Sequence, residues 1–87
     1  MSTYKKEILN HICYTALVYG RINKKLNLQL SNWEIEKMLL EIIQNTKEIN
    51  FEKRGKNIYI SNESGDIRIT INSFTIRVIT VDRIKQK

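Results

Sequence analysis

Arg68 and Arg77 are the side chains of this sequence whose type and spacing are best suited to chemistry. They lie nine residues apart in IRITINSFTIRVITVDRIKQK, and a hairpin that turns at Asn72-Ser73 would set them directly opposite each other. Like charges that face each other across a strand pair cost stability. Arginine forks bind phosphate and carboxylate groups at two points. The pair therefore indicates a surface that could hold an external anion.

The strands that would position these arginines follow from a change of period after Thr46. Apolar residues then alternate with polar ones in four runs, at about 49–53, 56–61, 66–71 and 74–82, separated by turns that contain Gly or Asn. With loops of two, four and two residues, all apolar strand residues fall on one side, and the facing pairs include Phe51 with Ile58, Ile60 with Ile67, and Ile69 with Ile76. This pattern predicts an antiparallel meander with one buried face.

The other face of the predicted sheet is polar and carries a row of side chains from all four strands: Asn50, Tyr59, Arg68 and Arg77. Bases stack on aromatic rings and phosphates bind arginine, so this row suits an extended nucleic-acid strand. The tail residues Arg83 and Lys85 would extend the basic surface. We therefore predict nucleic-acid-binding residues at Asn50, Tyr59, Arg68, Arg77, Arg83 and Lys85. The alternative is that Asp66 and Glu52 pair with the arginines inside the protein.

Two helices are expected before the sheet. Apolar residues recur at helical spacing over about residues 4–19, where Gly20 either ends the helix or lies inside a longer one. The segment SNWE, from Ser31 to Glu34, has the form of a capping box and begins a helix at about 32–44. The helices should cover the apolar side of the sheet, which predicts a single α+β domain over residues 1–87, in the order α-α-β-β-β-β.

Two further segments allow two interpretations each. Alternation breaks at Val78-Ile79, which indicates either a bulge or a strand end that dimerises through Ile79 and Val81, turned to the polar side. The basic residues Arg21, Lys24 and Lys25 lie between the two predicted helices. They either continue a phosphate-binding surface at the rim of the sheet or form a solvated loop face, and the lack of interleaved aromatic residues favours the loop.

Composition excludes several classes of protein. The chain has 87 residues, a net charge of +6 and one cysteine, so it has no internal disulfide and no cysteine-based zinc site. His11 has no Ser or Cys partner in a pattern typical of nucleophilic catalysis, and the three glycines are too scattered to form a phosphate-binding loop. We therefore assign no catalytic residue, metal or cofactor. No apolar run approaches the length of a membrane span, and the start, MSTYKKEILN, lacks a secretion signal, so we expect a cytoplasmic protein.

Two long segments carry a resemblance to a known family. CYTALVYGRINKKLNLQLSNWEIEKML and RGKNIYISNESGDIRITINSFTIRVITVDRI resemble the bacterial family known as domain of unknown function 3781. That resemblance implies a bacterial origin and brings no activity. A looser likeness, of fold and surface alone, is to the messenger-RNA-cutting toxins of the RelE type, and it implies that Tyr59, Arg68 and Arg77 would contact RNA.

These observations rank three functions. The first is a small module that binds RNA or single-stranded DNA through the open sheet face. The second is a protein-interaction or regulatory module, from a phage or its host, that presents the same basic face to an acidic partner. The third is a RelE-like ribonuclease, in which the arginines would stabilise a charged phosphate while Tyr59 or Glu52 assists proton transfer. The absence of a catalytic motif makes a non-enzymatic function the preferred one.

Overall fold

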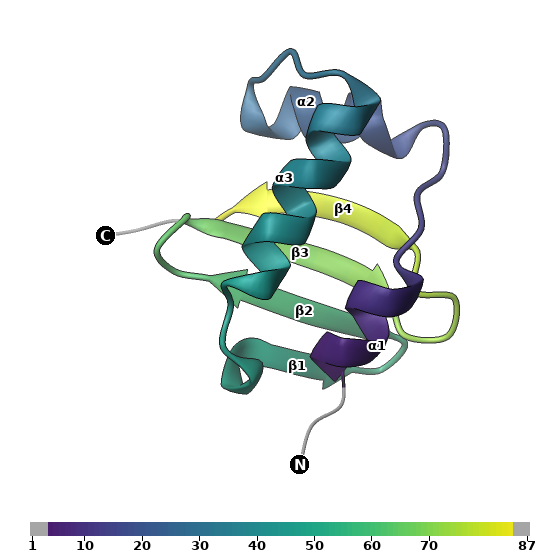
Figure 1. The fold of residues 1–87 in the computed structure, drawn as a ribbon, viewed down its shortest axis with the longest axis vertical. Coiled ribbons are helices and arrows are strands. Elements are labelled where there is room, and N and C mark those ends of the chain that lie inside the picture. Colours follow the sequence, from purple (N-terminus) through teal and green to yellow (C-terminus); the bar gives the residue numbers. More distant parts are fainter. Residues whose placement is uncertain (1–3, 85–87) are drawn as a thin grey trace.

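The computed structural model describes residues 4–84, which form three α-helices followed by a four-stranded antiparallel sheet (Figure 1). The helices are α1 (Tyr4–His11), α2 (Val18–Leu26) and α3 (Asn32–Gln44), and a 3-10 turn, η1 (Glu48–Asn50), precedes the sheet. The strands are β1 (Phe51–Arg54), β2 (Asn57–Asn62), β3 (Ile67–Asn72) and β4 (Val78–Arg83), in the order β1-β2-β3-β4. The predicted α+β class and the meander are confirmed.

Helix α3 has the bounds that the sequence predicts, because its first turn is capped as expected. The Ser31 hydroxyl accepts a hydrogen bond from the Glu34 N–H at 3.2 Å, and the Glu34 carboxylate accepts one from the Ser31 N–H at 2.8 Å. Ile35, Leu39 and Ile43 recur at every fourth position and are fully buried. The apolar side of α3 therefore lies against one face of the sheet (Figure 1).

The predicted helix at 4–19 is wrong in its extent, because residues 12–17 interrupt it. In that interval the backbone of Cys13 pairs with the segment that leads into β4. The Cys13 N–H donates to the Ile76 carbonyl and the Val78 N–H donates to the Cys13 carbonyl, both at 3.0 Å. This short parallel bridge uses backbone groups that a continuous helix would have consumed.

Helical structure resumes at Val18 and includes Gly20, as the alternative of a helix with an internal glycine anticipated. Val18, Ile22 and Leu26 form the buried side of α2. This helix lies beside β4 at the edge of the sheet, and its buried side chains belong to the same core as those of α3 (Figure 1). The position of α2 is the part of the fold that matters most for the site described below.

The predicted register of the first three strands is wrong by two residues. Phe51 pairs with Ile60 instead of Ile58, and Ile60 pairs with Ile69 instead of Ile67. A shift of two keeps every side chain on its predicted face, because side chains alternate with a period of two. The apolar residues of β1, β2 and β3 are therefore buried as predicted, whereas the neighbours on the polar face change. The prediction is wrong for Ile49 and Phe74, which lie outside the strands and are 86% and 77% exposed.

The connection from β3 to β4 is longer than the predicted turn at Asn72-Ser73, and it occupies residues 73–77. The Asn72 side-chain oxygen accepts hydrogen bonds from the N–H groups of Phe74 and Thr75, at 2.8 and 3.0 Å, and so fixes the start of this loop. As a result, Ile69 pairs with Val81 instead of Ile76. The strand predicted to begin at 74 begins at Val78.

The break in alternation at Val78-Ile79 is a β-bulge. Ile71 pairs with Val78 and Thr70 pairs with Thr80, so Ile79 is the extra residue. The bulge returns Val81 to the buried face, where it is fully inaccessible. The expectation that Val81 turns to the polar side is therefore wrong, and a dimer surface that includes Val81 is excluded in this fold.

A buried polar contact joins the end of α3 to the sheet. The Asn62 side-chain amide donates to the Thr46 hydroxyl at 2.8 Å, and the Asn62 side-chain oxygen accepts from the Gly65 N–H at 2.6 Å. Both Thr46 and Asn62 are buried. Because their polar atoms are paired, the contact fixes the β2–β3 turn without leaving an unsatisfied group in the core.

Candidate nucleic-acid interface

The predicted row of Asn50, Tyr59, Arg68 and Arg77 does not form. Tyr59 pairs with Glu52 and Thr70, whereas Arg68 pairs with Ser61 and Asp82. Arg77 precedes β4 and bridges to Cys13. The two arginines are therefore not opposite each other, and the like-charge conflict that suggested an anion-binding row is absent from this pair.

The other predicted site residues are also dispersed. Asn50 lies in η1, before the sheet begins, and the Arg83 guanidinium donates to the Leu26 carbonyl at 3.0 Å. Glu52 pairs with Arg54 at 3.0 Å, so it does not neutralise Arg68. Lys85 lies outside the residues that the structure describes. Tyr59 remains on the polar face, where the Arg54 guanidinium lies 5.9 Å from its ring centroid.

A different set of cations gathers on α2. Arg21, Lys24 and Lys25 are three and four residues apart, so they share one side of this helix. That side is distinct from the buried side formed by Val18, Ile22 and Leu26. Because α2 lies along the edge of β4, its cations border the polar face of the sheet.

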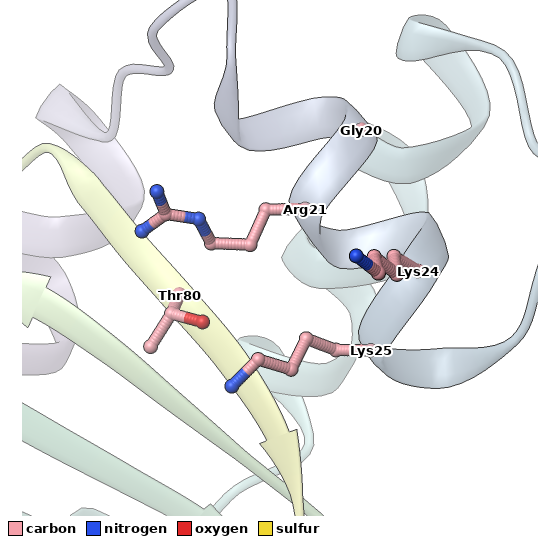
Figure 2. Close-up of a pocket in the computed structure, with 5 residues that line it drawn as sticks. All are labelled: Gly20, Arg21, Lys24, Lys25 and Thr80. Atoms are coloured by element: carbon pink, nitrogen blue, oxygen red, sulfur yellow. The ribbon is translucent and has the colours of Figure 1, made fainter.

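These cations line a cavity of about 750 Å³ between α2 and β4, together with Gly20 and Thr80. Figure 2 shows Arg21 and Lys25 reaching from α2 over β4, with Thr80 between them. The Arg21 guanidinium donates to the Ile79 carbonyl at 3.4 Å, and Lys25 forms an ion pair with Asp82 at 2.7 Å. Lys24 forms no hydrogen bond or ion pair within residues 4–84, so its ammonium is available to a ligand.

A second cavity, of about 240 Å³, continues the first one along β4. It is lined by Arg21 and Arg77, with Leu17, Ile79 and neighbouring residues between them. Arg21 lines both cavities, so the two adjoin at this side chain. We call the resulting set of cations, Arg21, Lys24, Lys25 and Arg77, the basic strip. Among the residues predicted from sequence, Arg77 alone belongs to it.

The sequence places Arg21, Lys24 and Lys25 between the two predicted helices and favours a solvated loop, whereas the structure places them on α2. The signal that would have placed them on a helix was present. Val18, Ile22 and Leu26 repeat at every fourth residue across Gly20, and the three basic residues fall on another side of the same helix. The edge position beside β4 depends on tertiary contacts and had no local signal.

Tyr14 and Tyr19, which are partly buried beside and within α2, are not suited to act as bases at neutral pH. Tyr19 donates a hydrogen bond to the Glu36 carboxylate, which raises the pKa of Tyr19 to about 12. Burial, followed by the nearby Glu36 charge, raises the pKa of Tyr14 well above its usual range. The two rings stack with centroids 5.5 Å apart. Their phenols therefore stay protonated and serve the packing of α2 against α3.

Other classes of site find no support in residues 4–84. No cluster of three or more His, Cys, Asp or Glu side chains there is arranged to hold a metal ion, and His11 and Cys13 are both exposed. None of the helices in that range has the length and apolar character needed to cross a membrane. Among residues 4–84, the basic strip is therefore the best candidate for a functional site.

Comparison with known proteins places the chain in a family. Residues 6–82 match the model of a family described as "Protein of unknown function (DUF3781)". No curated protein and no solved structure matches the chain. Because the match covers nearly all of its residues, the chain belongs to the DUF3781 family.

Proposed function

We propose that this member of the DUF3781 family binds single-stranded nucleic acid, RNA or DNA, through the basic strip. The observation that carries the proposal is the packing of α2 beside β4, which aligns Arg21, Lys24 and Lys25 along a cavity that continues to Arg77. A concave track lined by cations suits a phosphate backbone. The net charge of +6 adds long-range attraction to any polyanion.

The geometry favours a single strand over a duplex. A helix that reads duplex DNA enters the major groove with its polar side free. The basic side of α2 instead faces β4 across the cavity, as the Lys25–Asp82 ion pair and the Arg21 contact to Ile79 demonstrate. A flexible single strand can follow that cavity, whereas a rigid duplex is too wide to enter it.

Phe74 provides a candidate stacking surface for a base. Its side chain is 77% exposed, and it sits in the loop that leads into Arg77. The hydrogen bond from its N–H to Asn72 holds that loop in place. Stacking of one base on an aromatic side chain contributes about 1–3 kcal/mol and tolerates any base. The proposed interface therefore has affinity for backbone and base without sequence specificity.

The test is a salt titration with single-stranded oligonucleotides of about 12 nucleotides. If roughly three phosphates contact the strip, log affinity falls with log salt at a slope of about −2, or about 20-fold between 50 and 200 mM salt. The double variant Arg21→Gln with Lys24→Gln should lower that slope by about 1.4 and weaken binding at least about tenfold at 50 mM salt. Fluorescence anisotropy with labelled RNA and DNA measures both quantities.

The matched control is Lys6→Gln with Lys37→Gln, which removes the same charge from exposed positions of α1 and α3. This control should change affinity by less than about twofold, because Lys6 and Lys37 line neither cavity of the basic strip. Equal losses in both double variants would contradict the strip as the binding surface. Absence of binding to RNA and DNA at low salt would contradict the function itself and would favour an acidic protein as the partner.

A nucleic-acid partner implies a location in the cytoplasm.

A further inference from the structure

The larger cavity of the basic strip has one feature that a surface for the nucleic-acid backbone in general does not need. Thr80 lies in it, and the Thr80 hydroxyl oxygen is buried with no hydrogen-bond partner among residues 4–84. A buried polar atom without a partner costs stability, and native structures retain few of them. The hydroxyl can donate one hydrogen bond and accept two, so a ligand oxygen would satisfy it once the side chains that cover the hydroxyl move aside.

The charges around Thr80 indicate what kind of ligand fits. Arg21, Lys24 and Lys25 line the cavity, and Asp82 offsets Lys25 through their 2.7 Å ion pair. The three cations and one carboxylate leave a net charge of two positive units at the cavity. An internal phosphodiester carries one negative charge, whereas a phosphate monoester carries about −1.5 to −2 at pH 7. The cavity therefore matches a monoester better than a diester.

The donors also suit a terminal phosphate group. A monoester presents three free oxygens, which are strong hydrogen-bond acceptors. Arg21 has further N–H groups beyond the one bonded to Ile79, Lys24 has its full set, and Thr80 adds a hydroxyl. Figure 2 shows Arg21 reaching from α2 toward Thr80 on β4, and Lys24 lines the same cavity. A phosphodiester presents only two such oxygens and about half to two-thirds of the negative charge to the same donors.

We propose that this cavity binds the terminal phosphate monoester of a nucleic-acid strand, with Arg21 and Lys24 neutralising its charge and Thr80 donating to one of its oxygens. The inference rests on the proposed function, because it treats the phosphate as the end of the strand that follows the rest of the basic strip toward Arg77. The terminal phosphate lies in the larger cavity, and the following phosphates of the strand lie in the smaller cavity between Arg21 and Arg77.

The experiment compares one oligonucleotide in three forms: with a 5′ phosphate, with a 3′ phosphate, and with hydroxyl groups at both ends. We expect one of the phosphorylated forms to bind about tenfold more tightly than the hydroxyl form at the same salt concentration. Equal affinities of all three forms would overturn the inference while leaving the proposed function intact. Failure of every form to bind would instead refute the proposed function.

Variants separate the roles of the side chains. Thr80→Val keeps the shape of Thr80 and removes only its unpartnered hydroxyl, so the fold should be retained. It should reduce the preference for the phosphorylated end over the hydroxyl form about 3- to 10-fold. Lys24→Gln should weaken the binding of the hydroxyl form and of the phosphorylated form, and it should also reduce the preference for the phosphorylated form. An unchanged preference in Thr80→Val would overturn the assignment of its hydroxyl.

A competition experiment distinguishes a strand end from a small phosphate compound. Inorganic phosphate and a nucleoside monophosphate are added to the complex at constant ionic strength, with sulfate as the control for anions in general. We expect both phosphate compounds to displace the phosphorylated strand only at concentrations at least about 100-fold above that of the strand, since they lack the contacts along the strip. Binding of either one as tightly as the strand would overturn the assignment to a strand end.

Discussion

Asp82 offers a test in which a mutation should strengthen binding. Its carboxylate forms the 2.7 Å ion pair with Lys25 and lies opposite Arg68 in the β3–β4 register, so it lowers the positive potential at both cations. Asp82→Asn removes that charge and retains the shape of the side chain. A protein whose surface binds no anion would gain nothing from this change.

The expected gain follows from the geometry of the ion pair. A phosphate that contacts the Lys25 ammonium lies roughly 6 Å from the Asp82 carboxylate, which corresponds to a repulsion of about 0.7–1.4 kcal/mol at an effective dielectric constant of about 40–80. Removing it should tighten binding about 3- to 10-fold. The ion pair is partly exposed, with side-chain accessibilities of 48% and 35%. Its loss should therefore lower the free energy of unfolding by only about 0–1 kcal/mol.

The assay is fluorescence anisotropy with a labelled single strand at about 50 mM salt, alongside a denaturant titration of each variant. The control is Glu41→Gln, which removes the same charge from an exposed position of α3 and should change affinity by less than about twofold. Asp82→Asn that binds no better than Glu41→Gln, or more weakly than the unmodified protein, would refute the reasoning about the strip.

Three further predictions concern the fold that holds the strip. Leu39→Ala should lower the free energy of unfolding by about 2–5 kcal/mol in a denaturant titration, because Leu39 is fully buried under α3, and a loss below about 1 kcal/mol would contradict the packing. Asn62→Leu should cost about 1–3 kcal/mol in the same assay, because it leaves the buried Thr46 hydroxyl without the amide donor 2.8 Å away, and Thr46→Val in the same chain should recover part of that loss. Tyr19 has a folded-state pKa of about 12, raised above the usual 10, so its contribution to stability is present below pH 10 and is lost as the pH rises from 10 to 12. Spectrophotometric titration of the phenols should show that Glu36→Gln lowers the pKa of Tyr19, and an unchanged titration would contradict the hydrogen bond between them.

The two-layer arrangement was predictable because it depends on patterns that are local in the chain. The capping box from Ser31 to Glu34 marks the start of α3, and alternation after Thr46 identifies four strands and the buried side chains of β1, β2 and β3. The alternation does not give the starts of the first and fourth strands, where Ile49 and Phe74 are exposed. Even the bulge at Ile79 was visible, since the alternation of apolar residues breaks there. Each of these signals lies within a few residues of the feature that it predicts.

The neighbours on the polar face were not predictable in the same way. A period of two gives the same buried face for registers that differ by two residues, so Phe51 could pair with Ile58 or Ile60 without any change in burial. The turn after Asn72 was also longer than its two-residue signal indicated. The predicted row of arginines depended on both the strand register and the length of this turn, so it does not form in the structure.

The division of the first helix depended on contacts distant in sequence. Residues 12–17 continue the helical spacing of apolar residues, yet the backbone of Cys13 pairs with Ile76 and Val78, more than 60 residues later. Because of that pairing, α1 ends at His11 and α2 begins beside the edge strand β4. The basic strip follows from this tertiary contact, which is why the sequence identifies Arg21, Lys24 and Lys25 as a group but favours a solvated loop over a phosphate-binding surface.

The most direct test of the basic strip is to observe which backbone amides respond to a ligand. A ¹H–¹⁵N correlation spectrum is recorded while a single-stranded RNA of about 12 nucleotides is added at low salt. The account predicts that the largest chemical-shift changes fall in residues 20–25 of α2 and 77–82 at the start of and along β4. Changes confined to the polar face around Arg54 and Tyr59, or no changes at all, would contradict it.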